Sequence, residues 1–164
     1  MRAQITAVAL AALFCGTCSD SAGPSTLQPT LVISPPSPPA GSTIQVTGTA
    51  PGAFIPRGSG KLSVPISVTV GRDLPWAQMY VYLMTGPNAN DYCGQNLPDA
   101  PTWTPFPKGQ MATMTITGFQ VFRLPCEVTS LAVYLHTHNG NFPPPLPVDT
   151  VASASLAVNY HLVP

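Results

Sequence analysis

Apolar and polar residues alternate along several stretches of the chain, and the longest strict alternation runs from Lys61 to Val70. A period of two places every second side chain on the same face of a β-strand. This stretch therefore predicts a strand with one buried face. That face consists of Leu62, Val64, Ile66, Val68 and Val70.

Further stretches with a strand pattern are separated by segments rich in Gly, Pro and Asn, which are typical of turns. The predicted strands cover residues 31–33, 42–48, 61–70, 78–84, 111–117, 126–138 and 154–162. Beyond residue 17, no stretch of helical length shows the helical period. About seven strands at these spacings favour an all-β domain built as a sandwich of two antiparallel sheets.

The order of these strands, the Gly-rich turns and the segment AGSTIQVTG at residues 40–48 resemble the immunoglobulin-like domains of bacterial surface proteins. The resemblance covers about residues 30–163, and it implies an immunoglobulin-like antiparallel β-sandwich over residues 30–164. The family's disulfide joins two core strands. Here Cys93 falls in a long segment without a strand pattern and Cys126 stands at the start of a strand, so the expected bond is a peripheral clamp.

The first residues have the features of a signal peptide: Arg2 is followed by an apolar run from Ile5 to Phe14. The run is shorter than the about 20 residues that a transmembrane helix needs. An N-terminal core helix is the alternative. Gly16 and Thr17 precede Cys18, and this pattern resembles a bacterial lipoprotein signal.

The lipoprotein resemblance implies a signal peptide at residues 1–17, an acylated Cys18 in a lipid bilayer and a polar tether over residues 18–29. Ser19 after that cysteine implies the outer membrane of the cell envelope. The alternative is cleavage near Ser21 or Ala22, which would release a soluble periplasmic or secreted protein.

An exported chain meets an oxidising environment, where paired cysteines form disulfides. Only Cys93 and Cys126 remain beyond the signal region, so we predict a disulfide between them. A metal site built on these two thiols would need histidine partners.

Charged residues make up only 7% of the chain, whereas hydrophobic residues make up 45%, which is enough for a core. Loss of residues 1–17 removes Arg2 and leaves one more acidic than basic side chain. Without a basic patch, the chain lacks the electrostatic source of nucleic-acid binding, and we expect no nucleic-acid partner.

The strand predicted at residues 126–138 carries two of the three histidines. Leu131, Val133, Leu135 and Thr137 share one face, which we predict to be buried. The other face carries Tyr134, His136 and His138. In an immunoglobulin-like sandwich the neighbouring strand at residues 78–84 would add Tyr80 and Tyr82 to the same outward face.

This Tyr/His face has three interpretations. Tyr-rich surfaces suit contact with a protein or a carbohydrate. His136 and His138 are also weak candidates for a metal site, with a third ligand from His161, Asp149 or Glu127. The third interpretation is an ordinary sheet face with aromatic cross-strand pairs.

Sequence motifs of enzymes are missing: there is no G-x-S-x-G, no H-E-x-x-H and no phosphate-binding Gly-rich loop. We therefore expect a non-enzymatic envelope lipoprotein without a cofactor, which binds an envelope protein or a glycan or has a structural role. The alternative function is a metal-binding module or an enzyme that uses His136, His138 and a third ligand.

Overall fold

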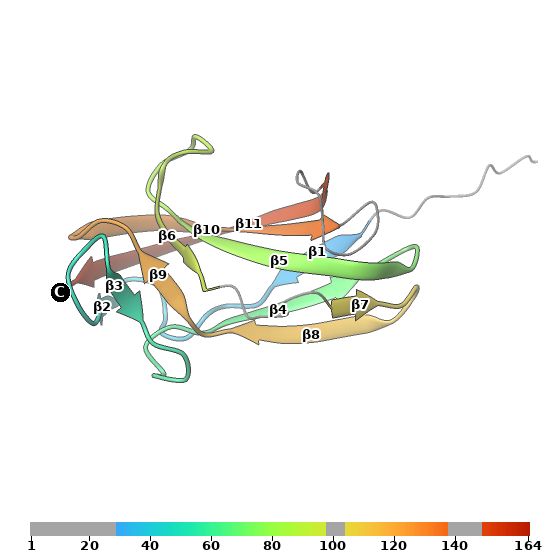
Figure 1. The fold of residues 1–164 in the computed structure, drawn as a ribbon, viewed down its shortest axis with the longest axis horizontal. Coiled ribbons are helices and arrows are strands. Elements are labelled where there is room, and N and C mark those ends of the chain that lie inside the picture. The colour runs from blue at the N-terminus through green and yellow to red at the C-terminus, as the bar shows by residue number, and fades with distance from the viewer. Residues whose placement is uncertain (1–28, 98–103, 138–148) are drawn as a thin grey trace, which may run out of the picture.

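The computed structural model describes residues 29–97, 104–137 and 149–164, and every regular element in these ranges is a β-strand. The predicted signal peptide, Cys18, nearly all of the tether and His138 lie outside the described residues. The strands form two sheets that face each other as the layers of a sandwich (Figure 1).

The smaller sheet has three antiparallel strands in the order β1-β4-β8. They are β1 (Thr30–Ile33), β4 (Val64–Thr69) and β8 (Met111–Ile116). The alternation that predicted the central strand is confirmed, because its apolar side chains are all at most 1% exposed. These buried side chains are Leu62, Val64, Ile66, Val68 and Val70.

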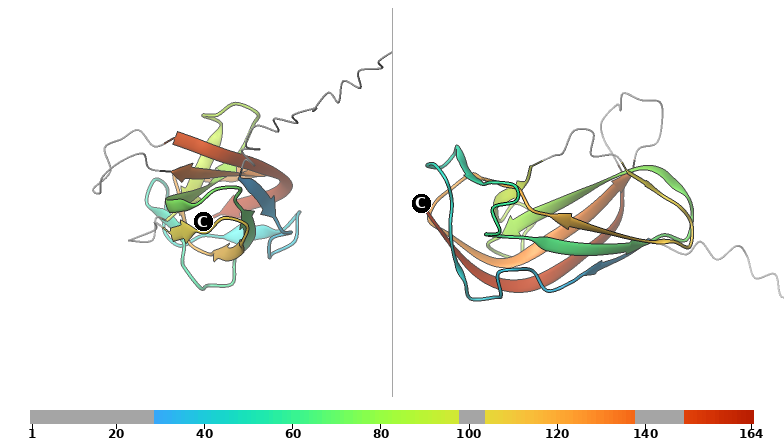
Figure 2. Two further views of the ribbon diagram at one scale, coloured as in Figure 1. Left: turned by 90° about the vertical axis from the view of Figure 1, so that its right-hand side faces the viewer. Right: turned by 90° about the horizontal axis from the view of Figure 1, so that it is seen from below.

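The larger sheet has eight strands, and its main path follows the order β2-β11-β10-β5-β6-β9-β3. The strands are β2 (Thr43–Gln45), β3 (Ala53–Ile55), β5 (Leu74–Met84), β6 (Tyr92–Asn96), β9 (Phe119–Val121), β10 (Cys126–Thr137) and β11 (Asp149–Val163). The eighth strand, β7 (Thr104–Phe106), pairs with β5. All pairs are antiparallel except β2 with β11. The right-hand view of Figure 2 shows how the long strands β10 (orange) and β11 (red) curve along the molecule.

One hydrophobic core fills the space between the sheets. The prediction of an all-β sandwich is thus confirmed, although the described residues form eleven strands instead of about seven. The additional strands β3, β6, β7 and β9 have only three to five residues each. Alternation cannot be recognised over so few positions, because two or three apolar residues fit many patterns.

Strand β10 lies at the centre of the larger sheet, between β11 and β5. Its predicted inner face is confirmed: Leu131, Val133 and Leu135 are fully buried, and Thr137 is 7% exposed. A register shift between Val128 and Ser130 interrupts the pairing with β11. Alternation restarts after this irregularity, and it therefore predicts the inner face of the strand correctly from Leu131 onward.

Cys93 and Cys126 form the predicted disulfide. The expectation that Cys93 lies in an irregular loop is wrong, because Cys93 belongs to β6, and both cysteines are buried. Ser130 of β10 is opposite Met84, the last residue of β5. Cys126 therefore lies beyond the end of β5, and the bond links the strands on either side of it, β6 and β10.

Candidate functional site

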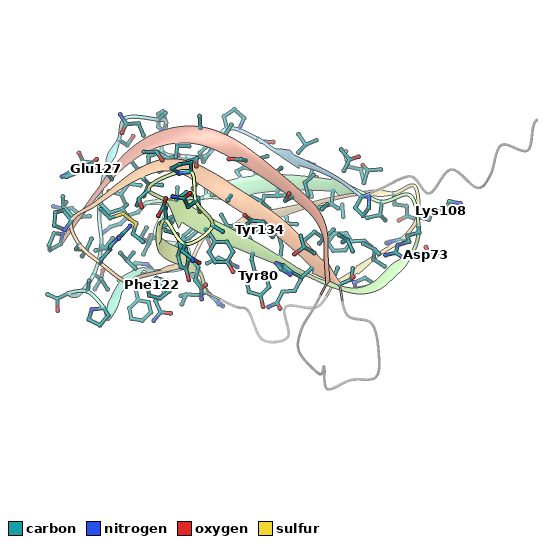
Figure 3. The ribbon with its side chains drawn as sticks, turned by 90° about the horizontal axis from the view of Figure 1, so that it is seen from above. Asp73, Tyr80, Lys108, Phe122, Glu127 and Tyr134 are labelled. Carbon is teal, nitrogen blue, oxygen red and sulfur yellow. A yellow bond between two sulfur atoms is a disulfide. The ribbon has the colours of Figure 1, made fainter. Side chains whose placement is uncertain are left out.

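Six aromatic side chains lie together on the outer surface of the larger sheet, and we call this surface the aromatic face. Its residues are Tyr80, Tyr82, Tyr92, Phe122, Tyr134 and His136. All six are half-buried, so each ring packs on its neighbours and keeps part of its surface in water. Figure 3 shows Tyr80 and Tyr134 in the middle of the molecule, and Phe122 toward one end.

The pairing of β5 with β10 builds the centre of the aromatic face. Tyr134 is directly opposite Tyr80, and Ala132 is opposite Tyr82. Paired residues of an antiparallel sheet point to the same side. Because Val81 and Val133, the residues between them, are fully buried, the tyrosines must point outward.

Rings on these two strands contact one another in a continuous chain. Tyr80 and Tyr82 stack with their centroids 6.3 Å apart and their planes inclined by 21°. Tyr134 meets the ring of Tyr82 edge-on at 5.6 Å. The His136 ring stands edge-on to Tyr80 at 4.9 Å. Such arrangements are the preferred ones for aromatic pairs, and they hold the face in one shape.

Two members of the aromatic face escaped the sequence analysis, because they belong to short elements. Tyr92 of β6 meets Tyr82 at 5.1 Å, and Phe122, directly after β9, meets Tyr92 at 6.1 Å. The only signal was their position in segments flanking the two cysteines, which the disulfide brings to the same region. These two rings extend the predicted Tyr/His face over a third strand, β6, and over the residue directly after β9.

Neutral amide side chains accompany the rings. The Tyr80 hydroxyl donates a 2.7 Å hydrogen bond to Oε1 of Gln78. Gln95 is paired with Tyr82 on one side and with Gln120 on the other, so both amides share the outward side. Phe54 is opposite Gln120 and is 37% exposed. This row therefore continues the face to the edge of the sheet.

The described side chains paired with these rings carry no formal charge. Besides the glutamines, they are Met84, Ala132, Thr150 and Ser153. Burial raises the pKa of Tyr80, and burial together with the neighbouring Tyr92, Tyr80 and Tyr134 raises the pKa of Tyr82. Both hydroxyls therefore stay neutral at physiological pH. Apart from the imidazole of His136, the centre of the aromatic face consists of rings, hydroxyls and amides that carry no formal charge.

The structure separates His136 from His161. Nδ1 of His136 lies 3.4 Å from the Thr150 hydroxyl, whereas Nδ1 of His161 contacts the Glu127 carboxylate. Glu127 and His136 are nine residues apart on β10, which corresponds to roughly 30 Å along a strand. Figure 3 shows Glu127 at one end of the molecule, away from Tyr134.

A metal site would need three ligands close together, and no group of three or more His, Cys, Asp or Glu residues is close enough in the described ranges. The structure does not bring His161 or Glu127 to His136 as a third ligand. Asp149 belongs to β11 opposite Thr137, but its side chain is not described, and His138 lies outside the described residues.

Comparison of the chain with protein-family models, with curated protein sequences and with solved structures finds no significant match. Residues 29–97, 104–137 and 149–164 contain no helix that is long and apolar enough to cross a membrane.

Proposed function

We propose that this protein is a non-enzymatic protein of the bacterial cell envelope that binds an uncharged glycan through the aromatic face. The observation that carries the proposal is the continuous, half-exposed layer of six rings with neutral amides beside it. The face is part of a sheet surface, and its rings are held by mutual contacts.

The chemistry of the aromatic face matches that of a neutral sugar polymer. A pyranose ring has an apolar side of C–H groups, which packs on an aromatic ring, and hydroxyl groups around its rim. Amide side chains both donate and accept hydrogen bonds, so Gln95 and Gln120 suit such hydroxyls. Tyrosine combines a large apolar surface with one polar atom and has little rotational freedom to lose on binding.

The absence of lysine and arginine among the described residues paired with the rings favours a neutral ligand over an anionic one. An anionic polymer would require cations on the face for a favourable electrostatic term. A protein partner is the alternative ligand, and interfaces between proteins are also rich in tyrosine. Amides and hydroxyls in rows beside the rings favour the glycan, whose polar groups are spread evenly along its length.

Tyr82 is the residue to test, because its ring contacts those of Tyr80, Tyr92 and Tyr134. Affinity electrophoresis of the purified protein in gels with neutral polysaccharides should show retardation. A panel of glucans, mannans and xylans covers the common neutral backbones. We expect Tyr82→Ala to weaken binding at least about tenfold, which corresponds to about 1.4 kcal/mol.

Two control variants make this test specific. Tyr82→Phe keeps the ring and should retain most of the binding. Val32→Ala removes an exposed apolar side chain, 54% exposed, from the smaller sheet and should bind as the wild type does. Circular dichroism verifies that each variant is folded. In the opposite outcome, the wild type binds no neutral polysaccharide but captures a specific envelope protein, and Tyr82→Ala abolishes that capture. This result would show that the ligand is a protein and not a glycan.

The envelope location rests on the sequence features of the first residues: Arg2, the apolar run after it, and Cys18 behind Gly16 and Thr17. We propose that Cys18 carries the lipid that holds the protein at the outer membrane. Cys18→Ala should then move the protein from the membrane fraction, or stop its processing. Unchanged fractionation and processing would leave export without acylation as the better account.

A further inference from the structure

The edges of the two sheets differ in how well they are protected against pairing with another strand. An exposed edge presents unpaired N–H and C=O groups, and proteins usually protect it by shortness, proline or charge. Strands β2 and β3 at the ends of the larger sheet have three residues each, and Phe54 of β3 also bridges to Thr47. Strand β1 has four residues and is followed by Pro35 and Pro36.

Strand β8 has none of these protections. It has six residues, Met111–Ile116, and contains neither proline nor a charged side chain. In the part of the chain that the structure describes, it pairs with β4 alone, so its other edge has no strand beside it. Its first residue, Met111, is 73% exposed, the highest value among the large hydrophobic side chains described.

The side chains of β8 are complementary to a second copy of themselves. Thr113 and Thr115 point outward and are exposed, while Ala112, Met114 and Ile116 point toward the core and are half-buried at the end of the sheet. Two antiparallel registers are possible, with the two-fold axis at Thr113 or at Met114. In both, each outward threonine lies opposite a threonine or methionine of the other copy, and the inward apolar residues lie opposite each other. Thr–Thr pairs and apolar pairs are favourable cross-strand neighbours, and no like charges oppose each other.

We propose that two copies of this protein pair through β8 in antiparallel orientation. The two smaller sheets then form one sheet with the order β1-β4-β8-β8-β4-β1. Closed two-fold pairing of identical surfaces is the commonest way in which proteins form dimers. The near-zero net charge of the chain adds little repulsion between the copies.

This dimer goes beyond glycan binding but has a consequence for it. A two-fold axis between antiparallel strands runs perpendicular to the sheet, so equivalent faces of both copies lie on the same side. The aromatic face is on the opposite layer from β8 and stays open in each copy. Both aromatic faces could then contact one polymer, and two linked sites bind a polymer more tightly than one.

The test is the oligomeric state of the exported, processed protein, measured in mild detergent by analytical ultracentrifugation over a range of concentrations. We expect a dimer for the wild type. Thr113→Lys combined with Thr115→Lys places like charges opposite each other whether the axis lies at Thr113 or at Met114. This variant should be monomeric at concentrations at least about tenfold above those at which the wild type dimerises.

A matched control separates edge pairing from a general effect of charge. Ala157→Lys with Asn159→Lys adds the same charge at two exposed positions of β11, inside the larger sheet, and should remain dimeric.

A wild type that is monomeric at every concentration overturns the proposal, and so does a dimer that persists in the β8 variant. If that variant does not fold, hydrogen exchange of the wild type decides: protection of the β8 amides must increase with protein concentration, and unchanged protection refutes the pairing. Glycan binding by a monomeric wild type would overturn the dimer and leave the proposed function intact.

Discussion

Alkaline pH should destabilise the fold through Tyr160, the largest of the fully buried side chains. Tyr160 lies on β11, and its hydroxyl donates a 3.0 Å hydrogen bond to the carbonyl oxygen of Pro38. Burial raises the pKa of Tyr160 to about 12 from its ordinary value of 10.0. The folded protein therefore holds the hydroxyl proton of Tyr160, which makes this hydrogen bond, more tightly than the unfolded chain does.

The sign and size of the effect follow from this difference in pKa. Above pH 10 the unfolded chain loses the Tyr160 proton first, so the folded state binds more protons and its free energy of unfolding decreases as the pH rises. The stabilisation is complete below pH 10 and is lost as the pH passes through about 12. Two pH units correspond to about 2 to 3 kcal/mol, against a total of about 5 to 15 kcal/mol for a typical domain.

Urea unfolding at a series of pH values from about 8 to about 11 measures the first half of this loss, about 1.4 kcal/mol by pH 11. Tyr160→Phe is the matched variant, because it keeps the ring in the core and removes the ionisable group. At neutral pH it should cost about 1 kcal/mol for the lost hydrogen bond to Pro38. Its stability should then decrease less steeply with pH than that of the wild type.

Tyr80 and Tyr82, whose pKa values burial also raises, contribute slope in both proteins. The comparison with Tyr160→Phe removes their contribution, because they are unchanged in the variant. Equal slopes for the two proteins would refute the assignment of a raised pKa to Tyr160. A wild type whose stability is constant up to about pH 11 would refute the argument for all three tyrosines.

Two further predictions concern the frame that supports the aromatic face. Replacement of both Cys93 and Cys126 by Ala opens a loop with a sequence separation of 33. It should lower the free energy of unfolding, measured by urea titration, by about 3 to 4 kcal/mol. A loss under about 1 kcal/mol would show that the bond constrains the unfolded chain little. Gly94→Ala places its Cβ 2.6 Å from the backbone oxygen of Gln120 and should cost about 1 to 3 kcal/mol. Gly52→Ala, whose Cβ would lie 3.6 Å from the backbone oxygen of Thr49, should melt close to the wild type. Equal melting temperatures for the two variants would contradict the close approach at Gly94.

The long strands could be predicted from sequence because each has one buried face and enough residues to repeat a pattern. Apolar residues at every second position from Leu62 to Val70 define the inner side of the central strand of the smaller sheet. The segment around Cys93 gave no such signal. At Gly94 a side chain would collide with the backbone of β9. The buried side chain of Asn96 accepts a hydrogen bond from the backbone N–H of Val81 and donates one to the backbone oxygen of Met79, both in β5. Tertiary contacts, and not a local pattern, make this segment a strand.

For the aromatic face, the sequence pattern predicts which side chains point outward, but the strand register determines which rings are neighbours. Alternation alone assigns Tyr80, Tyr82 and Tyr134 to outward positions, since a shift by one residue would bury them and expose valine. Alternation cannot determine which rings meet, because a shift by two residues keeps every side chain on its own side and changes every partner. The observed register places Tyr134 opposite Tyr80, and the bond from Cys93 to Cys126 holds β6, with Tyr92, in reach of β5. Continuity of the rings, on which the proposed glycan binding depends, is therefore a property of strand register and cross-linking, and loss of the disulfide should weaken glycan binding even where the strands themselves survive.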